Sequence, residues 1–143
     1  MIIQLTTGID KCVFGMTSKD TFSLYGKADK EFKDEEGNAI HQYNALKTKM
    51  TFYADENYRL GYLSCSHPEL TLWNEKIIGK NANESKEYLS KKGLKSFEVE
   101  SFDSFSNLFN EDFWTILQTE FDEVIKVEIG AIIKNQDEFD WKF

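Results

Sequence analysis

The sequence is short of arginine. Its 143 residues include 17 Lys+Arg against 25 Asp+Glu, which gives a net charge of −8, and Arg59 is the one arginine. Binding to nucleic acids depends on cationic side chains that neutralise phosphates. An acidic chain with one guanidinium group is poorly suited to that task, so we expect neither a nucleic-acid partner nor an anionic membrane surface.

Residues that build catalytic and metal sites are also scarce. The chain has two histidines, His41 and His67, and two cysteines, Cys12 and Cys65. It contains no HExxH, GxSxG or Walker-type phosphate motif. We therefore predict a protein that is not an enzyme, with no catalytic residues, no cofactor and no metal. A small hydrolase that uses Cys65 and His67 is the weakest alternative, because no third group that would orient them is evident.

Long apolar runs are missing as well. No run approaches the roughly 20 residues needed to cross a bilayer. The first residues lack the basic and apolar regions of a signal peptide. We expect a cytoplasmic protein whose two thiols stay reduced.

What is present favours a packed core, because hydrophobic residues make up 41% and aromatic residues 15% of the chain. In the first half, Thr17 and Gly26 predict a helix over 18–25. A charged loop is expected over 29–39. Alternating apolar residues predict a hairpin of strands 48–54 and 58–65.

The second half shows the same order of signals. A helix is predicted from Asn81 or Asn83 to about Lys92, and Gly93 stops it. A strand follows near 97–100, and 101–109 is strand-like with a turn near Asp103. A second hairpin pairs 113–121 with 123–133, and its apolar face is expected to carry Ile125, Val127 and Ile129.

The spacing of these signals predicts an internal repeat. Gly15 and Gly79 are 64 residues apart, and the hairpin turns at Asn57 and Asp122 are 65 apart. The predicted fold class is α+β, with two tandem helix-plus-antiparallel-sheet units packed as one domain over 1–143. The units cover about 8–73 and 74–134, and an aromatic, acidic tail covers 135–143.

Several short motifs resemble a known family. Gly15-Met16-Thr17, a short helix and then Gly26-Lys27-Ala28 resemble the opening of the helix-plus-sheet repeats in the β-lactamase-inhibitor-protein-like fold. Tyr43, the hairpin 50–64 and Leu72-Trp73 before Ile77-Ile78-Gly79 resemble bacterial proteins with two such units. Ala28 replaces the usual proline, and the second copy lacks Met-Thr after its glycine. Small acidic proteins of this sort are similar to immunity proteins of bacterial toxin systems, including contact-dependent growth inhibition. The resemblance implies a non-enzymatic binder of a cognate toxin domain.

The acidity gives this implied role a physical basis. Nuclease toxins approach phosphates with basic active sites, so an acidic inhibitor is steered towards them and can cover them. The candidate partner-binding residues combine acids and aromatics: Asp34, Glu35, Glu36, Tyr53, Tyr62, Trp114, Glu120, Asp122 and Glu128.

An alternative function is a structural or regulatory protein-interaction domain, which could form a homodimer. Phe139, Trp141 and Phe143 alternate with charges in the tail, as in an edge strand. This tail either docks on its own core or pairs with a partner strand. The sequence leaves that choice and the oligomeric state open.

Overall fold

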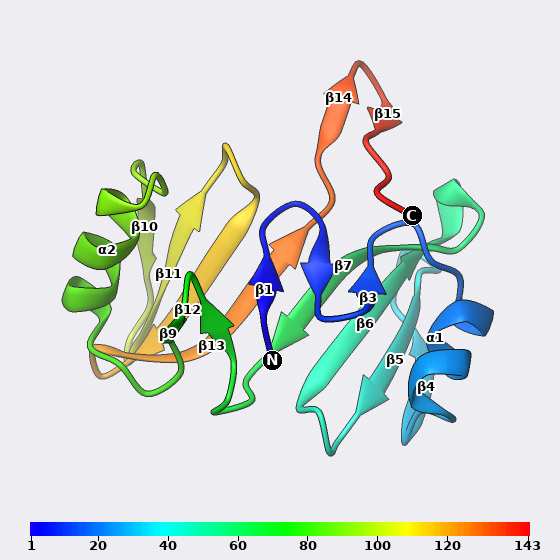
Figure 1. The fold of residues 1–143 in the computed structure, drawn as a ribbon, viewed down its shortest axis with the longest axis horizontal. Helices are drawn as coiled ribbons and strands as arrows, with labels where there is room; N and C mark the ends of the chain where they lie inside the picture. Colours follow the sequence, from blue (N-terminus) through cyan, green and yellow to red (C-terminus); the bar gives the residue numbers. More distant parts are fainter.

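An eight-stranded antiparallel sheet dominates the α+β fold in the computed structural model, which describes residues 1–143 (Figure 1). The strand order is β10-β11-β12-β13-β7-β6-β5-β4. The first half supplies β4 (Lys30–Lys33), β5 (Ala39–Tyr43), β6 (Thr48–Tyr53) and β7 (Arg59–Cys65). The second half supplies β10 (Glu98–Ser101), β11 (Phe105–Asn110), β12 (Thr115–Glu120) and β13 (Glu123–Gly130). Each half therefore forms a meander, and β7 pairs with β13 where the two halves meet.

Both predicted helices are confirmed. Helix α1 spans Ser18–Tyr25 and α2 spans Ala82–Lys91. The Asp20 carboxylate accepts the Thr17 N–H at 2.9 Å at the start of α1. The Asn81 side chain accepts two backbone N–H groups at the start of α2. These caps satisfy N–H groups that have no partner inside the helix, which explains why the helices begin there.

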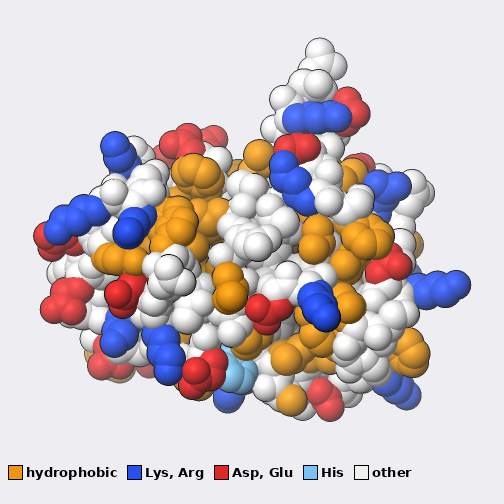
Figure 2. All heavy atoms as spheres, in the orientation of Figure 1, with side chains coloured by type: hydrophobic (Ala, Val, Ile, Leu, Met, Phe, Trp, Pro, Cys, Tyr) orange, Lys and Arg blue, Asp and Glu red, His pale blue; other side chains and the backbone are white.

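The helices and several short strands lie on one side of the sheet (Figure 1). The short strands are β1 (Ile3–Gln4), β2 (Gly8–Ile9), β3 (Cys12–Val13), β8 (Thr71–Leu72) and β9 (Glu75–Lys76). On this side, Lys and Asp/Glu side chains are interspersed (Figure 2). The excess of acid is thus not gathered over the helices.

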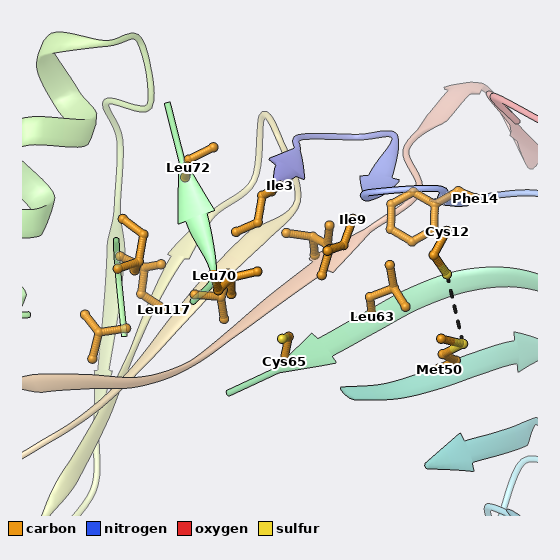
Figure 3. Packing of buried hydrophobic residues seen from close by; sticks show 14 of the residues in the cluster. Ile3, Ile9, Cys12, Phe14, Met50, Leu63, Cys65, Leu70, Leu72 and Leu117 are labelled. Carbon is orange, nitrogen blue, oxygen red and sulfur yellow. Dashed lines mark hydrogen bonds between the residues drawn. The ribbon is translucent and has the colours of Figure 1, made fainter. Parts of the chain in front are cut away.

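The core lies between these elements and the sheet. It is one cluster of 23 buried residues drawn from both halves of the chain. Phe14, Met50 and Leu63 are at most 1% exposed, and the Cys12 thiol lies 4.0 Å from the Met50 sulfur (Figure 3). Cys12 and Cys65 are both buried and free.

The two halves also share hydrogen bonds at matching positions. Gly15 N–H donates to the Leu60 carbonyl, and Leu60 N–H donates to the Met16 carbonyl. In the second half, Gly79 N–H donates to the Val124 carbonyl, and Val124 N–H donates to the Lys80 carbonyl. Each of these three residues lies 64 positions after its equivalent in the first half. We call two residues counterparts when they make the same backbone contacts in the two halves.

A β-bulge occurs at matching positions in β7 and β13. Thr51 and Phe52 pair with Tyr62 and Leu60, which leaves Gly61 as the extra residue of β7. Gln118 and Thr119 pair with Lys126 and Val124, which leaves Ile125 as the extra residue of β13. A bulge changes which side chains face the core. The prediction that Ile125 shares the buried face is therefore wrong: Val124 is buried there together with Val127 and Ile129.

The predicted charged loop over 29–39 is also wrong in part. Residues Lys30–Lys33 form β4, an edge strand that pairs with β5. All four residues are exposed, so the sequence shows no alternation of apolar and charged residues. Charged side chains are common on edge strands because they discourage pairing with other molecules. The turn 34–38 remains a loop.

The C-terminal tail packs on its own chain. Strands β14 (Ile133–Asn135) and β15 (Glu138–Phe139) form a small hairpin that projects from the sheet (Figure 1). The rings of Phe139 and Trp141 stack at 4.8 Å, and the Arg59 guanidinium lies 6.0 Å from the Trp141 ring. The backbone N–H groups of residues 142 and 143 donate to the Phe14 carbonyl. The end of the tail therefore docks on its own core, which is one of the two arrangements that the sequence leaves open.

Removing packing at the junction of the halves tests this architecture. Leu63 is fully buried in β7 and pairs with Ile129 of β13. We expect Leu63→Ala to lower the free energy of unfolding by about 2–5 kcal/mol, because a cavity replaces the side chain. Urea denaturation measures the change. Ser64→Ala is the matched control on the opposite face and is expected to stay within about 0.5 kcal/mol of the parent. Equal losses in both variants would contradict this placement of the core.

Candidate functional site: the open face of the sheet

One face of the sheet carries no helix, because the helices lie on the other. Side chains alternate between the two faces along a strand. The residues that alternate with the buried core, such as Thr51, Tyr62, Ser64 and Glu128, are therefore partly exposed on this open face. An antiparallel sheet with one solvated face is common, and such a face is available to a partner.

A hydrogen-bonded trio lies near the centre of the open face. The Tyr62 hydroxyl donates to Glu128 Oε1 at 2.5 Å, and Lys126 Nζ lies 3.1 Å from Glu128 Oε2. Burial, and then the hydrogen bond to the carboxylate, raises the pKa of Tyr62 well above its usual value of 10.0. The trio thus links an aromatic side chain to a cation through one shared carboxylate.

Two matching turns border the open face at opposite ends. In the β5–β6 turn, Lys47 N–H donates to the Asn44 carbonyl, and the Lys47 carbonyl accepts from Ser66 N–H. In the β11–β12 turn, Trp114 N–H donates to the Glu111 carbonyl, and the Trp114 carbonyl accepts from Gly130 N–H. Lys47 and Trp114 are counterparts, and both have left-handed φ angles, of 48° and 45°. The same backbone therefore presents an ammonium at one end of the face and an indole at the other.

Trp114 forms one wall of an apolar hollow of about 370 Å³, which we call the aromatic cleft. Its lining is mostly hydrophobic and comprises Tyr53, Glu111, Asp112, Trp114, Ala131, Ile132, Ile133 and Phe139. The Tyr53 and Phe139 rings lie 5.7 Å apart, and the Trp114 ring meets Phe109 edge-on at 5.1 Å. Glu111 and Asp112 are exposed and give the cleft an acidic rim.

Glycine allows the aromatic rings to lie close to the sheet. A Cβ atom on Gly130 would lie 2.2 Å from Trp114 Cδ1, and one on Gly61 would lie 2.1 Å from Tyr53 Cε2. Both distances are far below van der Waals contact. The flat surface at these two glycines fixes the positions of the rings on either side of the cleft.

Of the nine candidate partner-binding residues, four come together. Tyr53, Tyr62, Trp114 and Glu128 all lie on the open face, around the aromatic cleft and the central trio. Alternation along β6, β7 and β13 indicates the faces of Tyr53, Tyr62 and Glu128, whereas Trp114 lies in the β11–β12 turn.

The other five acids lie in two turns. Asp34, Glu35 and Glu36 lie in the β4–β5 turn, beside the start of β7, because Ala39 pairs with Phe52. Glu120 and Asp122 lie at the β12–β13 turn, beside the start of β13. Since β7 and β13 are antiparallel, these turns are at opposite ends of the sheet. The nine residues therefore do not form a single acidic surface.

Asp34 has a structural task in its turn. Its carboxylate accepts hydrogen bonds from the backbone N–H groups of Glu36 and Asn38 and from the Asn38 side chain. Such bonds stabilise a tight turn. The Asp34 carboxylate is thus engaged within its own turn.

Sequence reasoning missed several residues of the cleft. The alternation in the tail includes Phe139 but does not place it beside Tyr53, and no sequence pattern marks Glu111, Asp112 or Ile133. Phe139 is 86 positions from Tyr53, so no local pattern joins them. The Asp112-Phe113-Trp114 stretch between two strands was the one available signal.

Cys65 and His67 are engaged separately. The Cys65 side chain is fully buried, and its thiol lies 3.7 Å from the Leu46 carbonyl. The His67 Nδ1 atom accepts the backbone N–H of Glu69 in the following turn. This geometry gives no support to a Cys-His nucleophile pair.

Comparisons with known proteins identify a fold relative only. No family model matches the chain, and no curated protein matches it. An extracellular protein containing an SCP domain from Bacillus anthracis str. Ames is similar in structure, with a TM-score of 0.55 and 14% sequence identity. The similarity covers 83% of this chain and 46% of that chain, so the present chain spans about half of its length. At this identity the likeness concerns the fold alone. None of the helices has the length and apolar character required to cross a membrane.

Filling the space above Gly130 tests the aromatic cleft. We expect Gly130→Ala to displace the Trp114 ring and to lower the free energy of unfolding by about 1–3 kcal/mol, as overpacking does. Urea denaturation and the emission of Trp114, in a background with the other two tryptophans replaced by Phe, measure both effects. In a Trp114→Ala background the same glycine substitution should cost much less. An equal cost in both backgrounds would contradict the contact.

A second prediction concerns alkaline pH. Burial, and then the nearby Glu36 charge, raises the pKa of Tyr53 from 10.0 to about 12. The unfolded chain loses this proton near pH 10 and the folded chain keeps it to about pH 12, so rising pH favours unfolding in that window. The Tyr53 hydroxyl makes no hydrogen bond, so Tyr53→Phe removes little except the ionisable group. We expect a shallower fall in unfolding free energy between pH 10 and 12 in the variant. An unchanged slope would contradict the burial of the hydroxyl.

Proposed function

We propose that this chain is a non-enzymatic immunity or inhibitor protein that binds a bacterial toxin domain and covers its active site. The binding surface is the open face of the sheet, centred on the aromatic cleft. The single observation that carries the proposal is this cleft: a preformed apolar hollow with an acidic rim on a sheet face that no helix covers.

We also propose that the scaffold consists of two copies of one helix-plus-sheet unit. The support comes from the counterparts: the bonds of Gly15 and Leu60, the extra residue Gly61 and the turn at Lys47 all have equivalents in the second half. A two-unit scaffold of this kind is what the resemblance to β-lactamase-inhibitor-protein-like proteins implies. It presents a broad, continuous sheet face to one partner.

The chemistry of the cleft favours a protein partner with basic and apolar residues. Tyr and Trp are common anchors at protein interfaces because they combine a large area with a polar group. Trp114 is 41% exposed at the edge of the cleft, so its ring is accessible. Glu111 and Asp112 beside it can receive Lys or Arg side chains of the partner.

The overall charge supports the same partner. A net charge of −8 attracts a basic surface over a distance of about 10 Å at ordinary salt. A nuclease toxin has such a surface where it approaches phosphates. The charge thus speeds the encounter, and the aromatic contacts hold the complex.

The proposed compartment is the cytoplasm, where an immunity protein meets an incoming toxin. Two free cysteines that are buried rather than paired support a reducing compartment. Cell fractionation with an antibody against the chain tests this assignment, and recovery outside the cytoplasmic fraction would overturn it.

The test is binding to the toxin domain encoded beside this gene. The two proteins should co-purify, and the dissociation constant, measured by calorimetry, should rise with salt. Trp114→Ala should weaken binding by about 30-fold or more, as expected for an aromatic anchor. Glu111→Lys should mainly slow association.

Matched controls separate the cleft from general surface effects. Phe121→Ala removes an exposed aromatic ring at the opposite end of the sheet, and Glu75→Lys reverses an exposed acid on the helix side. Both should bind like the parent. If no toxin is encoded nearby, if the two proteins fail to bind, or if the controls lose as much affinity as the cleft variants, the proposal is wrong.

A further inference from the structure

A second hollow of about 410 Å³ lies on the same face, at the β5–β6 turn; we call it the lysine pocket. Its lining is polar and includes Asn44, Lys47, Lys49, Ser64, Ser66 and Lys126. It contains no acidic residue, although the chain carries 25 Asp+Glu. Three of the 17 basic residues therefore meet in one hollow of an acidic protein.

Strand pairing in the sheet brings the residues of the lysine pocket together. Lys49 of β6 pairs with Ser64 of β7, so both side chains point from the open face. Ser66 N–H bonds to the Lys47 carbonyl, which places these two residues one step nearer the end of the sheet. Lys126 lies on β13, two residues before Glu128, which pairs with Ser64. The β5–β6 turn (Lys47), strand β6 (Lys49) and strand β13 (Lys126) thus hold the cations without any long loop.

Most of the positive charge in the pocket has no partner within the protein. Lys47 and Lys49 form no ion pair, whereas Lys126 pairs with Glu128 at 3.1 Å. The other oxygen of Glu128 already accepts the Tyr62 hydroxyl. The Glu128 carboxylate thus pairs with one of the three ammonium groups, and the charges of Lys47 and Lys49 remain unpaired.

The lysine pocket also contains two serine hydroxyl groups that are free to donate hydrogen bonds. The side chains of Ser64 and Ser66 make no hydrogen bond within the protein and are half-buried. Ammonium and hydroxyl groups that converge on a hollow are suited to oxyanions, because each can donate to a negatively charged oxygen. No carboxylate lines the pocket, so it offers no negative charge to a cation.

The matching β11–β12 turn of the second half shows that the charge of the lysine pocket does not follow from the fold. Lys47 corresponds to Trp114 and Asn44 corresponds to Glu111, with the same backbone hydrogen bonds. The second half carries an indole and an acid on the turn where the first half carries an ammonium and an amide. Neither pair is required to build the turn, so the basic residues are available for binding.

We propose that the lysine pocket binds a small organic molecule through its oxyanion groups, either carboxylates or phosphates. A water molecule occupies about 30 Å³ in the liquid, so a hollow of 410 Å³ is larger than one inorganic phosphate needs. The unpaired ammonium groups of Lys47 and Lys49 can each contact a separate anionic group of such a ligand. This site is distinct from the aromatic cleft and does not depend on the proposed toxin.

The experiment is a titration of the isolated full chain with pyrophosphate and with citrate, at low salt. Backbone amide shifts in nuclear magnetic resonance spectra locate binding, and calorimetry gives the dissociation constant. We expect submillimolar binding by at least one probe, with the largest shifts at residues 47–49 and 64–66. Binding of pyrophosphate alone assigns phosphate ligands, and binding of citrate alone assigns carboxylate ligands.

A charge-matched pair of variants separates a site from general electrostatics. Lys47→Gln with Lys49→Gln should weaken binding at least 10-fold. Lys86→Gln with Lys95→Gln, which replaces a half-buried lysine of helix α2 and an exposed lysine after it, should change binding less than twofold. Ser64→Ala with Ser66→Ala should also weaken binding and keeps the charge. No binding by either probe, shifts outside the pocket, or equal losses in the lysine and control variants would overturn the proposal. None of these outcomes bears on toxin binding by the cleft.

Discussion

The pairing of β7 with β13 is the interaction on which the rest of the structure depends. Four residue pairs, from Tyr62 with Gly130 to Cys65 with Val127, join two four-stranded meanders into one sheet. On the covered side this pairing places Leu63 and Ile129 in a core that both halves share. On the open side it places Tyr62, Ser64 and Glu128 next to one another. Without it, neither the continuous core nor the broad face exists.

The two ends of the open face have the same backbone geometry but carry different kinds of side chain. Lys47 and Trp114 have the same backbone conformation and the same hydrogen bonds, yet one borders a cationic hollow and the other an aromatic one. Glu128 lies between them, bonded to Tyr62 on one side and to Lys126 on the other. One carboxylate thus contacts both an aromatic hydroxyl and an ammonium group near the centre of the face.

The sequence predicted the local elements better than the surface. Caps at Thr17 and Asn81 and polar turns predicted both helices and both hairpins, because those signals act within a few residues. Strand β4 was missed because an exposed edge strand shows no apolar alternation. The face of Ile125 was misplaced because a bulge shifts the alternation by one residue, and the partner strand determines where a bulge occurs.

The candidate site was predictable only in part, for a related reason. Tyr53, Tyr62 and Glu128 were predictable because alternation along each of their strands identifies a face, whereas Trp114 lies in a turn. The contact of Tyr53 with Phe139 and the grouping of Lys47, Lys49 and Lys126 depend on which strands become neighbours, and residues far apart in sequence decide that. Acids clustered in sequence, such as 34–36 and Glu120 with Asp122, lie in or next to turns and are separated by the sheet.

The junction strands also constrain the order in which the native state can form. β7 is complete in the chain by Cys65, but the strand that covers its free edge ends at Gly130. Until then, its outer edge exposes backbone N–H and C=O groups to any other strand. The contact of Phe14 with residues 142 and 143 spans nearly the whole chain and forms late in synthesis for the same reason. Because these contacts are so distant in sequence, folding is expected to be slow for a chain of this size, and the first half made alone is expected to aggregate.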